Sequence, residues 1–390
     1  MRRAPGRLRE LLGRGSPAPV GTALPAALAE LARTGPAPLS GDKPAADAPL
    51  RIATIVPSFR RGSGGHMTIV NLMRELGELG HDVTLWLEDC EGRHAREDAL
   101  LTRESFAEFF AWEGRPLHTD LGEWAGTDVV LATGWQTVAR ALLLPDVAAR
   151  AYLVQDHEPD FYPASAERLF SEQTYRQGLH CIAASEWLAE LLRTRYGASA
   201  SHFDLAVDHA IYRSCEEPRR ENLVAFYARA VTPRRAVPLG LMALTELARR
   251  RPNVEIALFG EDRPIDAPFA HTNLGVLAAE DLAALYRRAT VGMVHSLTNP
   301  SLIGLEMMAC GLACVDLASE SMVRSFGHNG PLWLSEPGAL EPCLALEGLL
   351  EDTTRREAMA TAGRAFMSTR TWRGAASQLE HAVSSLVWRT

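Results

Sequence analysis

From residue 51 onward, short apolar runs alternate with longer amphipathic stretches. In the first half of the chain the apolar runs are RIATIVPS, DVTLWLED, DVVLATG, AYLVQD and HCIAAS. A strand that helices cover on both faces of a parallel sheet has this nearly continuous apolar sequence. The stretches between the runs have helical periodicity and lie at 67–80, near 96–112, at 134–144 and at 185–197. Alternating strands and helices predict a doubly wound, Rossmann-like α/β domain over residues 50–205.

The pattern pauses near residue 206 and then resumes. The later apolar runs are NLVAFYAR, VEIALFG, NLGVL, VGMVHS and ACVDLA, with helical stretches between them. We therefore predict a second Rossmann-like domain over residues 206–370 and a C-terminal helix over 371–390 that packs back across the domains. Open α/β sheets bind ligands at the carboxyl ends of their strands, so two tandem domains of this kind predict a binding cleft between them.

Residues 1–49 differ from the rest in being rich in Ala, Pro, Gly and Arg. This composition predicts a disordered or extended tail. Within it, RLRELLGRG is either a short amphipathic turn in peripheral contact with an anionic membrane surface or a solvated part of the tail.

The composition narrows the class of protein. With 47% hydrophobic residues over 390 positions, the chain can bury a large core. A net charge of −8 argues against a nucleic-acid partner, which usually requires a basic surface. No apolar run reaches the roughly 18 residues of a membrane span, and the N-terminus lacks a signal-peptide core. The six cysteines include no C-x-x-C pair, so we expect no metal site and a reduced, cytoplasmic setting.

The first candidate site is a glycine-rich turn after the first predicted strand. Gly62, Ser63, Gly64 and Gly65 precede the first helix, where backbone amides can approach an anion. The turn is either a ligand loop or a plain flexible turn, and its spacing lacks the third glycine of a dinucleotide fingerprint. The adjacent His66 is either a contact for the acceptor or donor phosphate or an ordinary loop histidine.

The second candidate is HSLTNPSLIGLEMMACG at 295–311. We expect Asn299 to cap a helix, Pro300 to occupy its first position and Gly311 to end it. Either the free amides at the helix start bind a diphosphate and Glu306 accepts hydrogen bonds from ribose hydroxyls, or the segment is an ordinary helix cap with a solvated Glu, and we favour the first.

A third candidate is basic and a fourth is acidic. Arg229 ends a predicted strand, and Arg234 and Arg235 follow a Thr-Pro turn, which favours phosphate binding by the guanidinium groups.

Three titratable residues follow another strand, and they either cap the loop or act in catalysis and acceptor binding. They are Asp156, His157 and Glu158.

The segments QDHEP, FYARAVTPRRA and SLTNPSLIGLEMMACG together resemble retaining GT-B glycosyltransferases of family four, and within them the WsaF-type rhamnosyltransferases. The resemblance covers about residues 50–380. LEMMACG with Glu306 matches the second half of the family's E-x7-E segment closely. Thr298 replaces the first Glu of that segment, and Arg235 replaces the family's Lys.

The resemblance implies metal-free, retaining transfer of a hexosyl unit onto a glycan or lipid-linked glycan acceptor. In the family the missing Glu is associated with the donor hexose, so its replacement by Thr298 argues against UDP-glucose and suits a 6-deoxy sugar. The subgroup implies dTDP-L-rhamnose as the nucleotide sugar. The alternatives are a nucleotide-sugar 2-epimerase of similar architecture and a non-catalytic GT-B-like binding protein. The pattern does not determine the oligomeric state.

The site residues implied by the motifs and the resemblance fall into three sets. The donor-binding set is Gly64, Gly65, Arg229, Arg234, Arg235, Gly275, Val276, Leu277, Thr298, Asn299, Pro300, Ser301, Leu302 and Glu306. The catalytic set is Asp156, Glu158, Arg229 and Arg235. The acceptor-binding set is His66, Asp156, His157 and Glu158.

Overall fold

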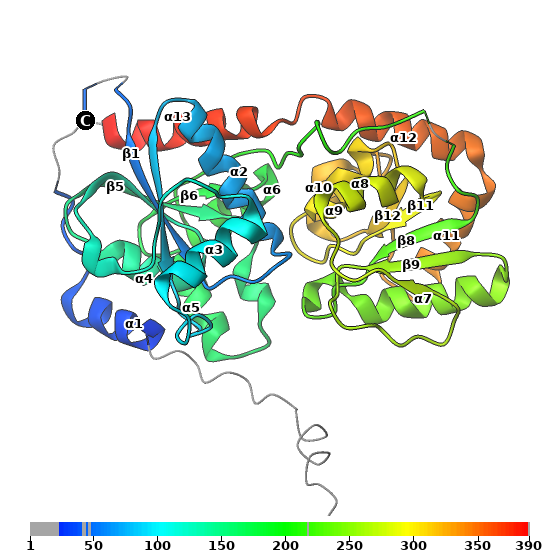
Figure 1. Ribbon diagram of the computed structural model, residues 1–390, viewed down its shortest axis with the longest axis horizontal. Helices are drawn as coiled ribbons and strands as arrows, with labels where there is room; N and C mark the ends of the chain where they lie inside the picture. Colours follow the sequence, from blue (N-terminus) through cyan, green and yellow to red (C-terminus); the bar gives the residue numbers. More distant parts are fainter. Residues whose placement is uncertain (1–22, 41–43, 46–47, 217, 389–390) are drawn as a thin grey trace, which may run out of the picture.

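Two α/β domains, each built on a parallel sheet, face each other in the computed structural model (Figure 1). The structure describes residues 23–40, 44–45, 48–216 and 218–388. In these ranges the strand order is β3-β2-β1-β4-β5-β6-β7 in the first sheet and β10-β9-β8-β11-β12-β13 in the second. The predicted fold class, two doubly wound domains of the GT-B kind, is confirmed.

The first domain contains the elements up to β7. Its strands are β1 (Arg51–Pro57), β2 (Asp82–Glu88), β3 (Leu117–His118), β4 (Thr127–Ala132), β5 (Val147–Val154), β6 (His180–Ala183) and β7 (Ala200–His202). Its helices are α1 (Ala23–Thr34), α2 (Gly64–Glu78), α3 (Ala99–Phe110), α4 (Trp135–Leu143), α5 (Ala166–Thr174) and α6 (Glu186–Tyr196), with 3-10 turns η1 (Leu121–Glu123) and η2 (Glu158–Phe161).

Strand β1 shows why the sheet is covered on both faces. Ile52 and Val56 lie in the apolar cluster shared with α2, α3 and the C-terminal helix. Ala53 and Ile55, which point to the other face, lie in the cluster shared with α4 and α6. Successive side chains alternate between faces, so a strand that is apolar at nearly every position requires helices on both sides.

The second domain repeats this arrangement with shorter strands. They are β8 (Leu223–Tyr227), β9 (Glu255–Phe259), β10 (Thr272–Asn273), β11 (Val291–Met293), β12 (Cys314–Leu317) and β13 (Trp333–Ser335). The helices are α7 (Val237–Arg250), α8 (Ala279–Arg288), α9 (Leu302–Ala309), α10 (Glu320–Phe326), α11 (Glu341–Glu351), α12 (Thr353–Met367) and α13 (Trp372–Trp388), with the 3-10 turn η3 (Pro233–Arg235).

The last helix, α13, follows the second domain in sequence but packs on the first. It runs along the top of Figure 1 in red and lies against α2. Trp372, Leu379 and Val383 are buried in the first domain's core. The backbone N–H of Asp204 donates to the side-chain oxygen of Gln378 (2.8 Å), which ties the helix to the segment that leaves β7.

Two expectations from the sequence are corrected here. The predicted tail contains the helix α1, whose Ala27 is buried and whose Leu31 packs against the first domain, because this face is apolar. The segment after α1 is also fixed, since the N–H of Ala37 donates to the carbonyl of Leu142 (2.9 Å). The predicted amphipathic turn RLRELLGRG lies outside the described residues. The predicted strand NLGVL is strand only at its first residue, because Gly275 takes a positive φ of 70°.

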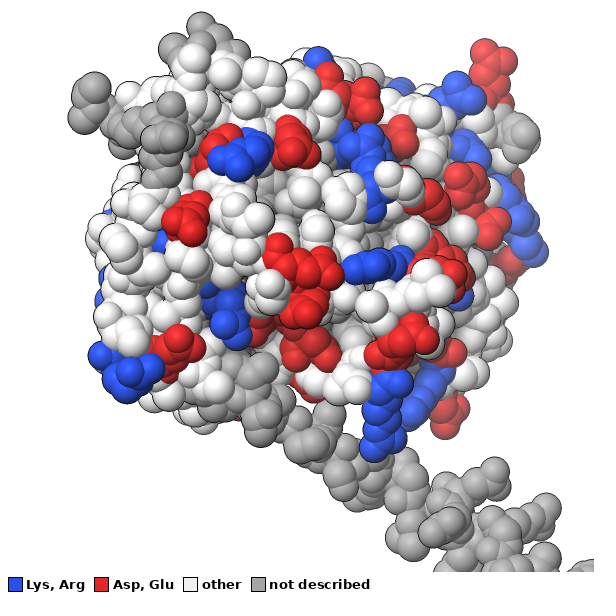
Figure 2. All heavy atoms as spheres, turned by 60° about the vertical axis from the view of Figure 1, so that its left-hand side comes forward, with Lys and Arg blue, Asp and Glu red and all other residues white. Residues whose placement is uncertain are grey.

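The charged surface of the first domain is mixed. On the face shown in Figure 2, acidic and basic side chains are interspersed and form no continuous basic surface. No helix in the described part of the chain is both long enough and apolar enough to cross a membrane.

Candidate functional site

Two buried arginines lie beyond the carboxyl end of β8. Arg229 is 9% exposed and donates from Nη1 to the carbonyl of Gly260 (3.1 Å). Arg235 is 8% exposed and donates from Nη1 to Ser296 Oγ (3.2 Å) and to the carbonyl of His295 (3.3 Å). Among the described residues, no carboxylate lies within ion-pair distance of either guanidinium. Because a buried charge without a counter-ion is unfavourable, this arrangement suits an anionic ligand.

The charges of both arginines influence a neighbouring phenol. Burial lowers the pKa of Arg235, and the neighbouring charge of Arg234 acts in the same direction. Burial raises the pKa of Tyr227, while the charges of Arg229 and Arg235 both act to lower it.

The glycine-rich turn of the first domain meets these residues. Gly62 has a φ of +73°, and a Cβ added there would lie 3.0 Å from Arg229 Nη1 and 3.1 Å from Val276 Cγ1. A Cβ at Gly64 would lie 4.0 Å from Leu302. The close approach of the other domain thus favours glycine at position 62, whereas the 4.0 Å distance at Gly64 is an ordinary van der Waals contact. The structure places this turn beside Arg229, Val276 and Leu302 of the predicted donor-binding set.

The start of α9 differs from the prediction by two residues. Ser301, not Asn299, is the N-cap, and its Oγ accepts a hydrogen bond from the N–H of Ile303 (3.4 Å). Pro300 therefore precedes the helix instead of opening it. The helix ends at Ala309, and Gly311 follows with a φ of +67°. The first-turn amides of α9 carry the partial positive charge that attracts phosphate.

The loop before α9 is held by the first domain. Thr298 Oγ1 donates to Asp156 Oδ2 (2.9 Å), and the N–H of Asn299 donates to Asp156 Oδ1 (2.9 Å). Asn299 Nδ2 donates to the carbonyl of Gln155 (3.0 Å). Thr298 and Asn299 are therefore engaged across the interface, and the expectation that they also contact the donor sugar stays a prediction.

His157 and Glu158, the residues that follow Asp156, also form hydrogen bonds within the protein. Glu158 Oε2 accepts hydrogen bonds from the N–H of Trp135 (2.7 Å) and from Tyr152 Oη (2.6 Å) inside the first domain. Burial raises the pKa of Glu158 to about 7, against the effect of these hydrogen bonds. His157 bonds Asp160 Oδ2 (2.7 Å) through Nδ1 and Tyr196 Oη (2.6 Å) through Nε2.

The side chains of His157 and Glu158 bond groups of their own domain, and that of Asp156 contacts the other domain. The expected roles of the three residues in acceptor binding and catalysis stay predictions.

His66 is likewise a structural residue. Its Nε2 lies 3.1 Å from the carbonyl of Pro57 and donates to it, so Nδ1 accepts from Ser63 Oγ (2.8 Å). The ring stacks on Phe110, with 5.3 Å between centroids. Burial lowers the pKa of His66 to about 4, which keeps it neutral. These contacts favour the alternative of an ordinary loop histidine over the predicted acceptor contact.

Glu306 lies inside the second domain, one turn into α9. Tyr286 Oη donates to Glu306 Oε2 (3.3 Å). Burial raises the pKa of Glu306 to about 8, while the hydrogen bonds from Tyr286 and Tyr212 act to lower it. The loop containing Gly275, Val276 and Leu277 follows β10, and of these Leu277 packs into the core.

Several site residues escaped the sequence analysis. Gln155 faces Gly65, whose added Cβ would lie 3.6 Å from the Gln155 amide. Asp316 Oδ1 accepts from the N–H of Ser296 (2.7 Å) and so fixes the residue that contacts Arg235. An acidic residue inside the apolar run ACVDLA was the available signal for Asp316.

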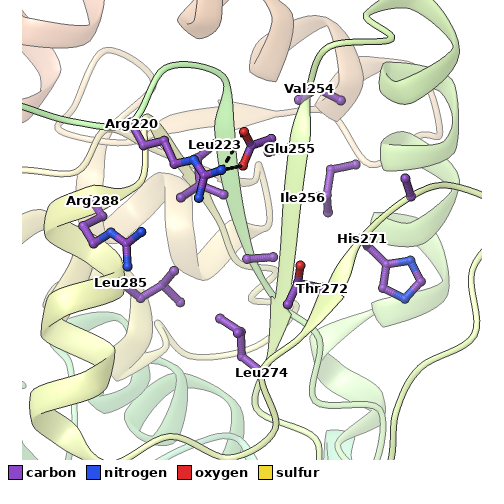
Figure 3. A pocket seen from close by; sticks show the side chains of 12 residues that line it. Arg220, Leu223, Val254, Glu255, Ile256, His271, Thr272, Leu274, Leu285 and Arg288 are labelled. Carbon is purple, nitrogen blue, oxygen red and sulfur yellow. Dashed lines mark hydrogen bonds and ion pairs between the residues drawn. The ribbon is translucent and has the colours of Figure 1, made fainter.

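Hollows of the described surface also lie away from these residues. One of about 360 Å³ is lined by Arg220, Glu255, Leu274 and Arg288 at the edge of the second sheet (Figure 3). Arg220 pairs there with Glu255 (2.7 Å), so its charge is already neutralised. In the described ranges no three His, Cys, Asp or Glu side chains are grouped to hold a metal ion.

The two facing α/β domains, with the buried arginines and the glycine-rich turn where they meet, define a GT-B protein. Comparisons with solved structures agree. Sucrose-phosphate synthase from Thermosynechococcus elongatus superimposes with a TM-score of 0.66 at 17% identity, covering 86% of this chain and 98% of that one. HepE from Anabaena, solved with UDP-glucose, superimposes with a TM-score of 0.67 at 15% identity, covering 86% and 100%.

Matches to protein-family models are more specific than the matches to solved structures. Residues 123–186 match the N-terminal domain of WsaF, and residues 222–325 match its C-terminal domain. Both α/β domains thus contain segments that match WsaF domains, and the predicted resemblance to GT-B proteins of the WsaF type is confirmed. The O-antigen biosynthesis protein RfbC of Myxococcus xanthus is 33% identical over 251 residues, or 63% of this chain. The chain spans only 20% of the length of that relative.

Proposed function

We propose that this protein is a glycosyltransferase that moves L-rhamnose from dTDP-L-rhamnose onto a growing surface glycan, with retention and without a metal. The observation that carries the proposal is the pair of buried guanidinium groups, Arg229 and Arg235, that lack a carboxylate partner among the described residues. The diphosphate of a nucleotide sugar supplies the missing negative charge. The WsaF domains, and a relative named for O-antigen biosynthesis, support a glycan acceptor.

The arginines would act on the leaving group. As the bond between the anomeric carbon and the phosphate oxygen breaks, negative charge develops on the diphosphate. Arg229, Arg235 and the first amides of α9 would stabilise that charge. A preorganised donor of this kind contributes about 3–4 kcal/mol to the transition state in comparable sites.

The acceptor proton would go to the leaving phosphate. Both oxygens of Asp156 accept bonds at the domain junction, and Oε2 of Glu158 is held by Trp135 and Tyr152 inside the first domain, so we assign the role of general base to neither. In a front-face reaction the acceptor oxygen bonds to the anomeric carbon on the side that the phosphate leaves, and its proton passes to a phosphate oxygen. This step gives retention and needs no other base.

Transfer of radiolabelled rhamnose from dTDP-rhamnose to a bacterial surface-glycan acceptor, in the presence of EDTA, tests the proposal. We expect Arg235→Gln to lower kcat about 10²–10³-fold while the melting temperature changes little. Arg220→Gln, which removes a surface guanidinium, should leave transfer unchanged. If calorimetry detects no binding of dTDP, UDP or GDP, the protein is a non-catalytic relative. Epimerised sugar without transfer would favour the epimerase.

A pair of glycine variants tests where the nucleotide binds. Gly62→Ala and Gly92→Ala both place a side chain at a positive φ, of +73° and +64°, which strains the backbone similarly. Only Gly62 faces the other domain, since nothing lies within 4 Å of a Cβ at Gly92. We expect weakened dTDP binding in Gly62→Ala alone. Equal binding by both variants would move the site away from the glycine turn.

A further inference from the structure

A single carboxylate of the first domain receives several donors from the second. Asp156 Oδ1 accepts from the N–H of Asn299 (2.9 Å) and, in its own domain, from that of His157 (2.9 Å). Asp156 Oδ2 accepts from Thr298 Oγ1 (2.9 Å) and lies 3.1 Å from Arg234 Nε. The residue is 6% exposed. Three of its four partners therefore belong to the other domain.

The surrounding contacts strengthen the same junction. Asn299 Oδ1 accepts from Ser185 Oγ (2.8 Å), the residue that also caps α6. The guanidinium of Arg234 lies over the ring of Phe161, 4.0 Å from its centroid, so first-domain residues contact Arg234 on two sides. These bonds fix the loop that leads from β11 into α9.

We propose that Asp156 is a positioning residue that holds the two domains closed and so places the start of α9 beside the glycine-rich turn. Separation of the domains would break all three contacts at once and would leave both the carboxylate and Arg234 without a charged partner. Charge-assisted hydrogen bonds of this kind are stronger than neutral ones. The closed and open arrangements are therefore two distinct states, and Asp156 favours the closed one.

The proposal makes two separable predictions. The interdomain distance depends on Asp156 whatever the ligand is. The effect on dTDP binding rests on the proposed function, because only a ligand that contacts both domains gains from closure.

Glu158 offers a matched control. It lies two residues from Asp156 and is similarly buried, at 5%, but its donors Trp135 and Tyr152 belong to its own domain. Replacement of either acid removes a buried carboxylate from the same segment. Only replacement of Asp156 removes bonds between the domains.

The experiment measures the interdomain distance by double electron–electron resonance in the full chain. Spin labels replace exposed Glu104 on α3 and Arg249 on α7, in a background where the exposed Cys215 is Ser. We expect Asp156→Ala to shift the distance distribution to longer values and to weaken dTDP binding about tenfold or more. Glu158→Ala should lower the melting temperature with the distances unchanged.

Two outcomes would overturn the proposal: unchanged distances in folded Asp156→Ala, or equal lengthening in Glu158→Ala. If Asp156→Ala does not fold, Thr298→Val removes one interdomain hydrogen bond and should give a smaller shift in the same direction, whereas no shift contradicts the proposal. If the wild-type protein binds no nucleotide, the proposed function fails while the distances still decide the role of Asp156.

Discussion

The raised pKa of Glu306 makes the stability of the folded protein depend on pH. Burial raises its pKa to about 8, so at neutral pH the folded protein holds the carboxyl protonated, whereas the unfolded chain ionises it near its ordinary value of 4.5. The folded state binds the extra proton between these two pKa values. The contribution of the Glu306 carboxyl to the free energy of unfolding is therefore fully present at low pH and declines as the pH rises to about 8.

We expect Glu306→Gln to remove this dependence. The free energy of unfolding of the variant, relative to that of the wild type, should increase between pH 5 and pH 8, by at most about 1.4 kcal/mol per pH unit. Urea unfolding of both proteins at several pH values measures it. Because Glu158 and Asp316 also have raised pKa values, of about 7, only the difference between the two proteins reports on Glu306. Parallel curves would contradict the assignment.

Individual site residues were predictable only where the required chemistry was local. Arg229 and Arg235 could be found because they follow a strand and because unpaired guanidinium groups there imply an anion. Asp156 was selected because its position after a strand suggested catalysis, whereas its interdomain partners Thr298 and Asn299, more than 140 positions away, could not be foreseen. A pairing between domains leaves no periodic pattern in the sequence.

At the scale of elements, one arginine joins the ends of two helices. Arg219 Nη1 donates to the carbonyls of Tyr286 (2.6 Å) and Ala289 (2.9 Å), at the end of α8. Its Nη2 donates to those of Cys310 (3.0 Å) and Gly311 (2.6 Å), at the end of α9. The terminal carbonyls of a helix carry partial negative charge, so a guanidinium there stabilises both helices. The opposite end of α9 faces the candidate anion site.

Arg219→Met should lower the free energy of unfolding by about 2–4 kcal/mol, because it leaves several helix-end carbonyls without donors. The neighbouring Arg220→Met removes a surface ion pair with Glu255 and should change it by less than about 1 kcal/mol. Chemical denaturation of both variants makes the comparison. An equal, small effect would mean that water replaces the guanidinium at these helix ends.

The long elements were predictable and the short ones were not. Strands such as β1 and β5 are recognisable because most of their residues are apolar, with Arg51 and Thr54 as the exceptions in β1 and Arg150 in β5. The strands β3, β7 and β13 have two or three residues each, too few for a period to appear. Helix α1 was missed because its Ala-rich and Pro-containing sequence resembles a tail. Its order comes from packing on α4, which is a tertiary effect.

At the scale of the whole molecule, the first domain is incomplete without the last helix. Leu379 and Val383 of α13 are fully buried against the first domain, although the second domain lies between them in sequence. A fragment that ends after β7 would expose this apolar face. Large exposed apolar patches lead to association of chains.

We expect residues 23–206 alone to aggregate, and the same fragment extended by a short Gly-Ser linker and residues 371–388 to be a soluble monomer. Size-exclusion chromatography with light scattering distinguishes the two. The linker can be short, because Asp204 already bonds Gln378 of α13. The control carries Leu379→Asp in the appended helix and should aggregate like the fragment. A soluble, folded fragment without α13 would show that the first domain is complete by itself.

The return of α13 has a mechanical consequence. The chain passes between the domains twice, once after β7 and once before α13, and both passages run along the same edge in Figure 1. They are bonded to each other, since His209 Nε2 donates to the carbonyl of Arg370 (3.1 Å). Two bonded connections at one edge would favour rotation of the domains about that edge over twisting. Any such rotation would return the glycine-rich turn to the start of α9.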